Sequence, residues 1–550
     1  MTNMKRDCMI CGVISPVIIG TGILSILVLS LLLASISFIL GSSITGCIFP
    51  LAVVCSGGIV AFESRKDQRA IWMNLVVYIL LVMLSLFVSS LTFDYSWDGL
   101  AYHQDIILQL KEGWNPIYTH HAPNANEILA IWVNHYAKGL ETLSAVVYAF
   151  TNDIETGKAI NFLLVISSIC FAFNYLSISW GNLTIRKRWF YTLIFSLSPV
   201  VVAQWLTFYI DWSMYSLLLI LVSLLLSVNR ITLLHSFCII GVFVLAFSIK
   251  FNVAFWVSFL MLFFIIYYLY VKKYSVACPL IFLSVGGSLI GICLVGFNPY
   301  ITNIIDHSNP FYPLLGEGNV DIMLDQTPLN MRGRSALENI IISLFSHAAA
   351  DPSWNAVWAF PLQFSKHDIV SIGYSDARLS GFGVLFSGIL LLCIYLYCRC
   401  KMEKKDRKTS LLVLFVLFLS LFILPSGWWA RYVPFFYGFP LLMVLFTERG
   451  YLSLVNVILR RFIYCLIVVN VGIIGYSTLK YHALPYLRHS KEALEIVRNA
   501  NNPRLFLDRN VGFKIKLDQH NIPYIEKKDT IGMNVNLGLL PPVWISSTKK

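Results

Sequence analysis

The sequence predicts an all-α polytopic membrane protein with about thirteen transmembrane helices. Of its 550 residues, 57% are hydrophobic and only 13% are charged, and the mean hydropathy is +0.71. These values lie far outside the usage of soluble globular proteins. Apolar runs of about 20 residues, long enough to cross the hydrocarbon core of a bilayer, recur along almost the whole chain. Three polar stretches interrupt or follow these runs, and they predict outward loops and a small outward C-terminal α/β appendage.

The apolar runs and the residues that break them predict the individual spans. We expect transmembrane helices at approximately 17–40, 44–62, 70–91, 158–180, 189–208, 211–228, 231–249, 251–270, 277–297, 381–398, 410–425, 432–447 and 462–479. The first run is too long for the core of a signal peptide, and no convincing small-residue cleavage site follows it. We therefore expect it to be a retained helix.

The short basic loops predict the orientation, because Lys and Arg accumulate on the cytoplasmic side of a membrane. The basic positions that fall on one side are Lys5 and Arg6, Arg65, Lys66 and Arg69, 186–188, Lys272 and Lys273, 401–408, and Arg460 and Arg461. That side is predicted to be cytoplasmic, with the N-terminus on it and the C-terminus outside. The formal charge of +12 comes largely from these loops. It predicts contact with anionic membrane lipids and no nucleic-acid partner.

The polar stretches define the predicted domains. Residues 1–480 form a transmembrane domain with outer loops at 92–157 and 298–380, and residues 481–550 form a small extracytoplasmic segment. None of the twelve cysteines lies in these outer pieces, so the fold must rest on helix packing without disulfides. Leu337–His347 has an amphipathic pattern. Two pieces of the tail, Leu505–Asp508 and Phe513–Leu517, have strand-like patterns.

The first outer loop is where we expect chemistry. Its segment Phe93-Asp-Tyr-Ser-Trp-Asp-Gly-Leu-Ala-Tyr-His103 places Asp94, Asp98 and His103 directly after a span. A surface helix is expected over residues 101–112, ended by Gly113. Further titratable groups of this loop are Asp105, Glu112, His120, His121 and Glu127. The alternative interpretation is a solvated loop whose aromatic residues form an interfacial belt.

These motifs resemble the GT-C glycosyltransferases, which take a sugar from a polyprenyl-phosphate carrier at the outer face of the membrane. Asp98-Gly-Leu-Ala-Tyr-His103 followed by Gly113-Trp-Asn-Pro116 is similar to a loop of bacterial relatives of protein O-mannosyltransferases and lipid A aminoarabinose transferases. Asn309-Pro-Phe-Tyr-Pro313, Arg378-Leu-Ser-Gly-Phe-Gly383 and Trp428-Trp-Ala-Arg-Tyr432 resemble further pieces of such proteins. The resemblance covers the organisation of about the first 480 residues. It implies an inverting glycosyltransferase of the cell envelope, in a bacterial inner (plasma) membrane.

The resemblance implies roles for the residues of the first loop. The family has an adjacent Asp-Glu pair in its mannosyltransferases, whereas this chain has Asp94 and Asp98 four residues apart. We assign Asp98 as the base that takes the proton of the acceptor hydroxyl, with Asp94 as its helper or a ligand of a sugar hydroxyl. His103 lies about one helical turn beyond Asp98 and near the same face. Its alternative role is a hydrogen bond to the backbone that holds the loop.

The departing lipid phosphate needs cationic ligands near the outer boundary. Lys250 and Arg431 are candidates, and Asp211 could meet a sugar or pair with Lys250. The alternatives are that Lys250 extends to the headgroups and that Arg431 is an interfacial anchor. Arg332, Arg334 and Arg378 of the second outer loop are candidate contacts of pyrophosphate-linked glycans. The substrate-binding candidates are completed by Tyr102, Trp429 and Tyr432.

No metal-ligand set and no certain cofactor is predicted, although the aspartates and histidines of the first loop could hold a divalent cation. The predicted partners are a polyprenyl-phosphate-linked sugar donor and a glycan, lipid or protein acceptor. Two alternative functions remain open. One is an O-antigen-type polymerase that joins preassembled repeat units, and the other is a flippase or transporter for a lipid-linked glycan. A transporter should have charges or broken helices near the middle of the membrane, whereas this chain has its polar residues near the predicted outer rim.

Overall fold

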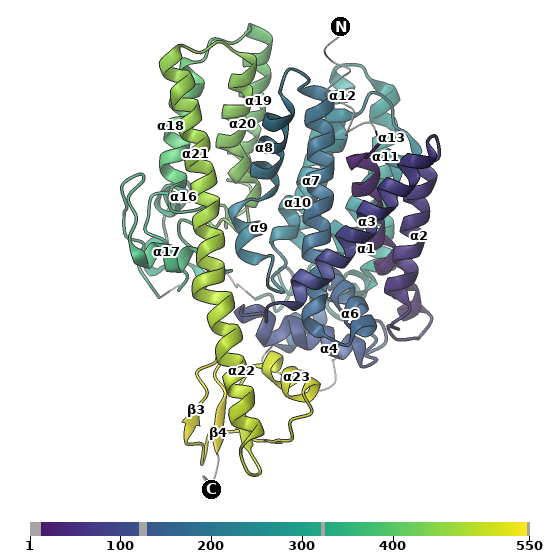
Figure 1. The fold of residues 1–550 in the computed structure, drawn as a ribbon, viewed down its shortest axis with the longest axis vertical. Helices are drawn as coiled ribbons and strands as arrows, with labels where there is room; N and C mark the ends of the chain where they lie inside the picture. The colour runs from purple at the N-terminus through teal and green to yellow at the C-terminus, as the bar shows by residue number, and fades with distance from the viewer. Residues whose placement is uncertain (1–12, 120–128, 321–324, 352, 547–550) are drawn as a thin grey trace.

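The computed structural model describes residues 13–119, 129–320, 325–351 and 353–546 of the chain. It is a tall bundle of helices with a small appendage at one end (Figure 1). The helices of the bundle are α1 (Pro16–Ile39), α2 (Ile48–Glu63), α3 (Gln68–Ser90), α7 (Ala159–Ser179), α8 (Ile185–Ser196), α9 (Pro199–Gln204), α10 (Trp212–Ser227), α11 (Leu233–Ile249), α12 (Phe251–Tyr270), α13 (Tyr274–Ile290), α18 (Phe386–Arg399), α19 (Lys404–Ser420), α20 (Gly438–Phe446) and α21 (Leu454–Ser477).

Six of the described helices are long and apolar enough to cross a membrane. They are Pro16–Ile39, Gln68–Ser90, Ile154–Ser179, Phe251–Tyr270, Tyr274–Val295 and Leu454–Arg498. Four shorter apolar helices accompany them: Ile48–Glu63, Trp212–Ser227, Leu233–Ile249 and Phe386–Arg399. These helices identify a membrane protein. Each predicted span overlaps a helix, but the number of about thirteen spans stays a prediction.

The predicted span at 189–208 is not one continuous helix. It is divided into α8 and α9 at Ser198, whose side chain accepts a hydrogen bond from the backbone N–H of Val201. Pro199 occupies the first position of α9, where its missing N–H costs nothing. A capping serine followed by proline therefore starts a new helix within the apolar run.

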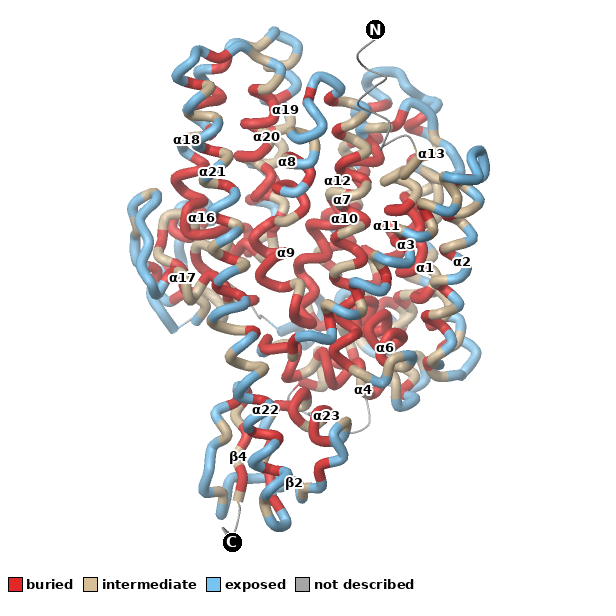
Figure 2. The backbone as a smooth tube through the Cα atoms, viewed as in Figure 1, coloured by how far each residue is buried: buried red, intermediate tan, exposed pale blue. Residues whose placement is uncertain are grey.

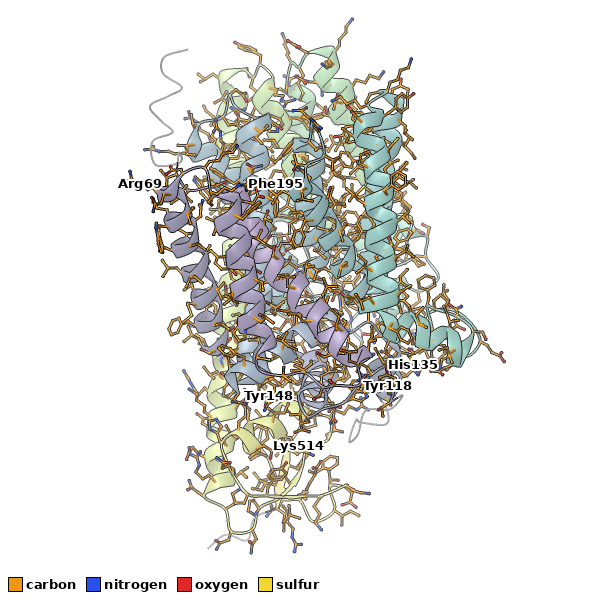
Figure 3. The ribbon with its side chains drawn as sticks, turned by 90° about the vertical axis from the view of Figure 1, so that its right-hand side faces the viewer. Arg69, Tyr118, His135, Tyr148, Phe195 and Lys514 are labelled. Carbon is orange, nitrogen blue, oxygen red and sulfur yellow. The ribbon has the colours of Figure 1, made fainter. Side chains whose placement is uncertain are left out.

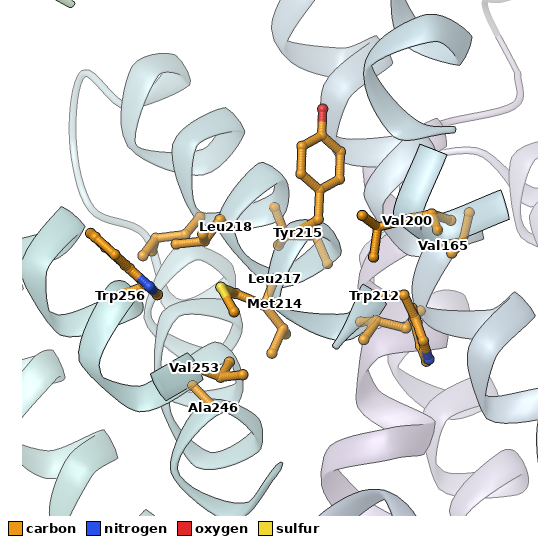
Figure 4. Packing of buried hydrophobic residues seen from close by; sticks show 14 of the residues in the cluster. Val165, Val200, Trp212, Met214, Tyr215, Leu217, Leu218, Ala246, Val253 and Trp256 are labelled. Carbon is orange, nitrogen blue, oxygen red and sulfur yellow. The ribbon is translucent and has the colours of Figure 1, made fainter. Parts of the chain in front are cut away.

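The core lies along the centre of the bundle, where α10 is packed between its neighbours (Figure 2). Met214 and Leu217 of α10 are flanked by Val165 of α7 on one side and by Val253 and Trp256 of α12 on the other (Figure 4). The hydroxyl of Ser167 on α7 donates to the backbone oxygen of Gly20 on α1 at 2.9 Å. Small and hydroxylated residues thus let α1 and α7 approach closely, as is common between membrane helices.

The two ends of the bundle differ in composition. Arg69 lies near the upper end, whereas Tyr118, His135 and Tyr148 lie near the lower end, above the appendage that carries Lys514 (Figure 3). The loops between α12 and α13 and between α18 and α19 also lie at the end opposite the appendage (Figure 1). These basic loops therefore lie at the end of the bundle opposite to the polar loops and the appendage. Which side of the membrane each end faces stays a prediction.

Short helices between the spans make up the polar end of the bundle. They are α4 (Gln104–Lys111), α5 (Ala130–His135), α6 (Gly139–Thr151), α14 (Thr302–His307), α16 (Ala336–Leu344) and α17 (Lys366–Ile372). The helix expected over residues 101–112 is present as a π-helical turn at Gly99–His103 followed by α4. Ile106, Ile107 and Leu110 are buried, and Gly113 follows the helix with a φ of 106°. The amphipathic stretch at 337–347 coincides with α16, which begins with a capping box at Ser335.

The C-terminal appendage combines two helices with a four-stranded sheet. It contains α22 (Leu484–Arg498), which continues α21 through a π-helical segment, and α23 (Val511–Gln519). The strands are β1 (Arg504–Phe506), β2 (Ile525–Glu526), β3 (Val535–Asn536) and β4 (Trp544–Ser546), in the order β2-β1-β4-β3. β1 pairs in parallel with β2 and antiparallel with β4.

One of the two predicted strands is wrong. Residues 505–508 do contribute to β1, but residues 513–517 belong to helix α23. The alternation of apolar residues and lysines there has the period of a strand. Asn510 nevertheless starts a helix by accepting the Phe513 N–H at 2.9 Å, and Lys516 is buried by packing against the bundle. Tertiary contacts therefore override the local pattern.

Candidate active site

A cavity of about 760 Å³ lies at the polar end of the bundle, on the side of the appendage. It is lined by residues of the first polar loop, the second polar loop, the segment around Trp429, and Leu540 of the appendage. Eight residues that the sequence singled out line it: Asp98, Tyr102, His103, Lys250, Arg378, Trp429, Arg431 and Tyr432. Asp94 and Asp211 do not line the cavity, but Asp211 pairs with Lys250 and Arg431, which do. Of the loop histidines and acids, His120, His121 and Glu127 lie outside the described residues.

The loop that carries Asp98 is shaped by Asp94. The carboxylate of Asp94 accepts hydrogen bonds from the backbone N–H and the hydroxyl of Ser96, at 2.9 and 2.7 Å, and Gln104 approaches its other oxygen at 3.3 Å. Gly99 passes so close that an added Cβ would overlap this carboxylate. Asp94 is thus a positioning group that turns the chain after α3.

Burial changes the acidity of Asp94. Removal from water, aided by the nearby Glu155 carboxylate and opposed by the hydrogen bonds from Ser96, raises the pKa of this carboxyl group to about 6. The backbone N–H of Asp94 donates to Glu155 at 3.1 Å. Asp94 is therefore enclosed by protein and has no route to a substrate in the cavity.

The π-helical turn brings Asp98 and His103 together. The N–H of Gln104 bonds to the carbonyl of Gly99, five residues earlier, which places residues five apart above one another. Asp98 and His103 both line the cavity as a result. His103 does not hold the backbone: its Nδ1 lies 2.6 Å from Oε1 of Glu141 on α6.

Arg431 is the centre of an ionic network. Its Nε donates to Asp211 at 2.7 Å, and its two terminal nitrogens lie 2.8 Å from Asp376 and 3.4 Å from Asp98. The guanidinium also lies 4.8 Å from the ring centroid of Tyr209 and 5.1 Å from that of Trp429. A guanidinium suits this position because it offers five donors in a rigid plane. The Arg431 side chain is thus largely enclosed by the protein, 11% exposed, and is paired with three carboxylates.

Asp211 joins Arg431 to Lys250. The ammonium of Lys250 lies 2.6 Å from Oδ1 of Asp211 and 4.9 Å from the ring centroid of Tyr432. Burial of Asp211 alone would raise its pKa, but the two cations outweigh burial and hold the pKa below its ordinary value. Of the two alternatives for Asp211, a sugar contact or a pair with Lys250, the structure contains the pair. Lys250 turns into the protein instead of extending to the headgroups.

The second polar loop adds Arg378 and Asp376 to the cavity. Arg378 donates to the backbone oxygen of Ala350 and to the side chain of Gln326, and it lies 3.4 Å from Asp376. Burial raises the pKa of Asp376, although Arg431 and Arg378 oppose this change. The other two candidate arginines of this loop, Arg332 and Arg334, are exposed and bond to nearby backbone oxygens.

Several hydrogen-bond donors of the cavity have no acceptor. Among the described residues, the Nε of Arg378 and the indole Nε1 of Trp429 are buried without a partner. To acceptors in the described part of the chain, Arg431 donates three hydrogen bonds and Lys250 one, although these side chains carry five and three N–H groups. Buried polar groups are normally paired, so unpaired donors around a cavity indicate that a ligand with acceptor oxygens completes them.

Several residues of the site escaped the sequence analysis, among them Asp376, Glu141 and Tyr209. Asp376 is separated from Arg378 by one residue, and this spacing of opposite charges was a signal. Glu141 lies in the first turn of α6, and its sequence neighbourhood carried no sign of its pairing with His103. Tyr209 precedes Asp211 by two residues and carried no sign beyond this proximity.

Within the described part of the chain, no group of three or more His, Cys, Asp or Glu side chains is arranged to hold a metal ion. Comparison with known proteins adds no assignment. No protein-family model, no curated protein and no solved structure matches the chain.

Proposed function

We propose that the protein is an integral-membrane glycosyltransferase that moves a sugar from a polyprenyl-phosphate-linked donor to a glycan, lipid or protein acceptor. The observation that carries the proposal is the convergence of unpaired N–H donors with the carboxylate of Asp98 on a single cavity. The donors fit the oxygens of a phosphate, and the carboxylate fits an acceptor hydroxyl. Both groups are needed when a sugar leaves a lipid phosphate.

The reaction is a single displacement. The oxygen of the acceptor hydroxyl forms a bond to the anomeric carbon while the bond from that carbon to the phosphate oxygen breaks. The electron pair of the broken bond stays on the departing phosphate, and the hydroxyl proton passes to Asp98. Attack from the face opposite the phosphate inverts the anomeric centre.

The cations stabilise the charge that the phosphate gains. Arg431, Lys250 and Arg378 line the cavity and have N–H groups available for its oxygens. Asp211 pairs with Arg431 and Lys250 but does not line the cavity, so its negative charge does not face the phosphate. Prearranged donors of this kind lower the barrier because they need no reorganisation during the reaction.

The position of the cavity suits a lipid carrier. Asp98 follows α3, Lys250 precedes α12, and both helices are long and apolar enough to span a membrane. A substrate with a polyprenyl tail could therefore keep its tail in the bilayer while its phosphate enters the cavity.

The test is a turnover assay with the purified protein in lipid nanodiscs. Undecaprenyl-phosphate-linked glucose, galactose, mannose and aminoarabinose would be supplied with membrane extract as the acceptor source, and released undecaprenyl phosphate would be measured. We expect release from at least one donor. No release from any of them would contradict the proposal. Movement of an intact donor between leaflets would then favour a flippase, and extension of pyrophosphate-linked repeat units would favour a polymerase.

A further inference from the structure

The proposed reaction leaves one part of the cavity lining without a role. Glu141, His103, Trp132 and Tyr136 all line the cavity. They come from α6, the π-helical turn and α5 with its C-cap, so they do not belong to the cation network around Arg431. The proposed reaction uses none of these four residues, so their polar atoms in the cavity need a separate explanation.

His103 and Glu141 form a buried pair with a defined direction. The side chains are 3% and 4% exposed, and Oε1 of Glu141 lies 2.6 Å from Nδ1 of His103. A carboxylate at this distance holds a proton on Nδ1, so Nε2 is the ring nitrogen left for another partner. The structure gives Nε2 no partner among the described residues, and it is the ring atom available to a ligand in the cavity.

Glu141 has a second unpaired acceptor. Its Oε2 is buried and has no hydrogen-bond partner among the described residues. A buried carboxylate oxygen without a donor is unfavourable, and a structure normally avoids it. Nε2 of His103 and Oε2 of Glu141 are therefore two unpaired polar atoms of one buried pair, and two neighbouring hydroxyl groups, which can donate and accept, would satisfy both.

Trp132 and Tyr136 add an aromatic surface. Their ring centroids are 5.1 Å apart and their planes meet at 67°. Lys138 fixes the end of α5 that carries them, because its ammonium donates to the carbonyls of Asn134 and Tyr136 and to the side chain of Asn298. The C–H face of a pyranose ring packs on such aromatic rings, while its hydroxyl edge needs hydrogen-bond partners.

We propose that Glu141, His103, Trp132 and Tyr136 form a subsite for a pyranose sugar with two neighbouring hydroxyl groups. The proposal of a sugar-binding subsite rests on the proposed function in one respect, which is the identity of the molecule that supplies the sugar. Its ligand is either the sugar of the lipid-linked donor or the terminal sugar of an acceptor glycan. The chemistry of recognition is the same for both.

Direct binding tests the subsite without any need for turnover. The full-length protein in nanodiscs would be mixed with the methyl glycosides of glucose, galactose, mannose and N-acetylglucosamine, and saturation-transfer NMR would report binding. We expect binding of at least one glycoside, weakened about tenfold by Glu141→Gln, as the loss of one hydrogen bond of about 1.4 kcal/mol would do. Glu317→Gln, at an exposed carboxylate, is the matched control and should bind as the unaltered protein does.

A second variant keeps the test informative if Glu141→Gln does not fold. Trp132→Ala should also weaken binding, whereas Trp354→Ala, at an exposed tryptophan, should not. Thermal unfolding would confirm that each variant is folded. Absence of binding by the intact protein to all four glycosides would overturn the subsite. Equal binding by the Trp132→Ala and Trp354→Ala proteins would overturn it as well.

The turnover assay then identifies the source of the sugar. A higher KM of Glu141→Gln for the lipid-linked donor in its hydrolysis by water assigns the subsite to the donor sugar. Unchanged donor hydrolysis with impaired transfer assigns it to the acceptor glycan. Glycoside binding by a protein that releases no undecaprenyl phosphate would leave the subsite standing and contradict the glycosyltransferase.

Discussion

The Nε of Arg431 donates to Oδ2 of Asp211 at 2.7 Å, and this pair joins segments that are 220 residues apart in the chain. Asp211 is fully buried and also holds Lys250. Two cations of the cavity thus depend on one carboxylate that has no contact with the cavity itself. This relationship makes the arrangement of the site and the stability of the bundle interdependent.

Replacement of Arg431 should therefore affect stability and activity together. Arg431→Met leaves Asp376 and Asp98 without their shared partner, and loss of one member of a buried ion pair costs about 3–5 kcal/mol. We expect a clearly lower melting temperature in nanodiscs. Arg334→Met, at an exposed arginine 3.9 Å from Glu338, is the control and should melt as the unaltered protein does. Equal melting temperatures of the two variants would contradict the network.

Gly99 should be intolerant of even a methyl group. A Cβ at this position would overlap the Asp94 carboxylate and the Ser96 hydroxyl, so Gly99→Ala has to displace the turn that carries Asp98. We expect at least about a tenfold loss of turnover, since small displacements of catalytic groups are costly. Gly58→Ala, where a Cβ meets open space on α2, should keep full turnover. Full turnover by Gly99→Ala would show that the turn is not needed.

Lys516 should hold the appendage to the bundle. Its ammonium lies 2.7 Å from Glu155, and it is 4.4 Å from the ring centroid of Phe93 at the start of the Asp98 loop. Lys516→Met should make the appendage more susceptible to limited proteolysis and should lower turnover. Lys514→Met is a matched control, because Lys514 pairs with Glu526 at the surface. Identical cleavage of both variants would contradict this role.

Asp94 should make stability depend on pH. Its pKa is raised from 3.8 to about 6 by burial, so the folded state favours the neutral carboxyl group. The resulting stabilisation is complete below the unfolded pKa and is lost as the pH rises through about 6, by about 3 kcal/mol at most. Asp94→Asn cannot ionise. The melting temperature of the unaltered protein should therefore fall relative to that of the variant between pH 4 and pH 7. A constant difference between the two melting temperatures across this range would show that the pKa of Asp94 is not raised.

The placement of acids directly after a span indicated part of the cavity lining, since Asp98 and His103 follow α3. The segment that carries Trp429 and Arg431 was indicated by its resemblance to a family motif and by its position after another apolar run. Composition could not separate Asp94 from Asp98. That distinction depends on the turn at Gly99, which buries one carboxylate and leaves the other in the cavity.

Other parts of the site depend on contacts between distant segments. Glu141 becomes a site residue only because the π-helical turn directs His103 towards α6. Asp376 becomes a site residue because the second polar loop folds back and brings its carboxylate to Arg431. The helix at 511–519 is a similar case, since Asn510 and contacts with the bundle decide against the strand that the local alternation favours.

The comparison of Asp98→Asn with Asp94→Asn tests the central claim most directly. Both proteins would be assayed for release of undecaprenyl phosphate from the donor that the unaltered protein accepts, after thermal unfolding has shown that both are folded. Asp98→Asn should lose at least about a hundredfold in turnover, as expected for removal of a general base, whereas Asp94→Asn should lose no more than about tenfold. Equal losses in the two variants, or full turnover by Asp98→Asn, would contradict the assignment of Asp98 as the base.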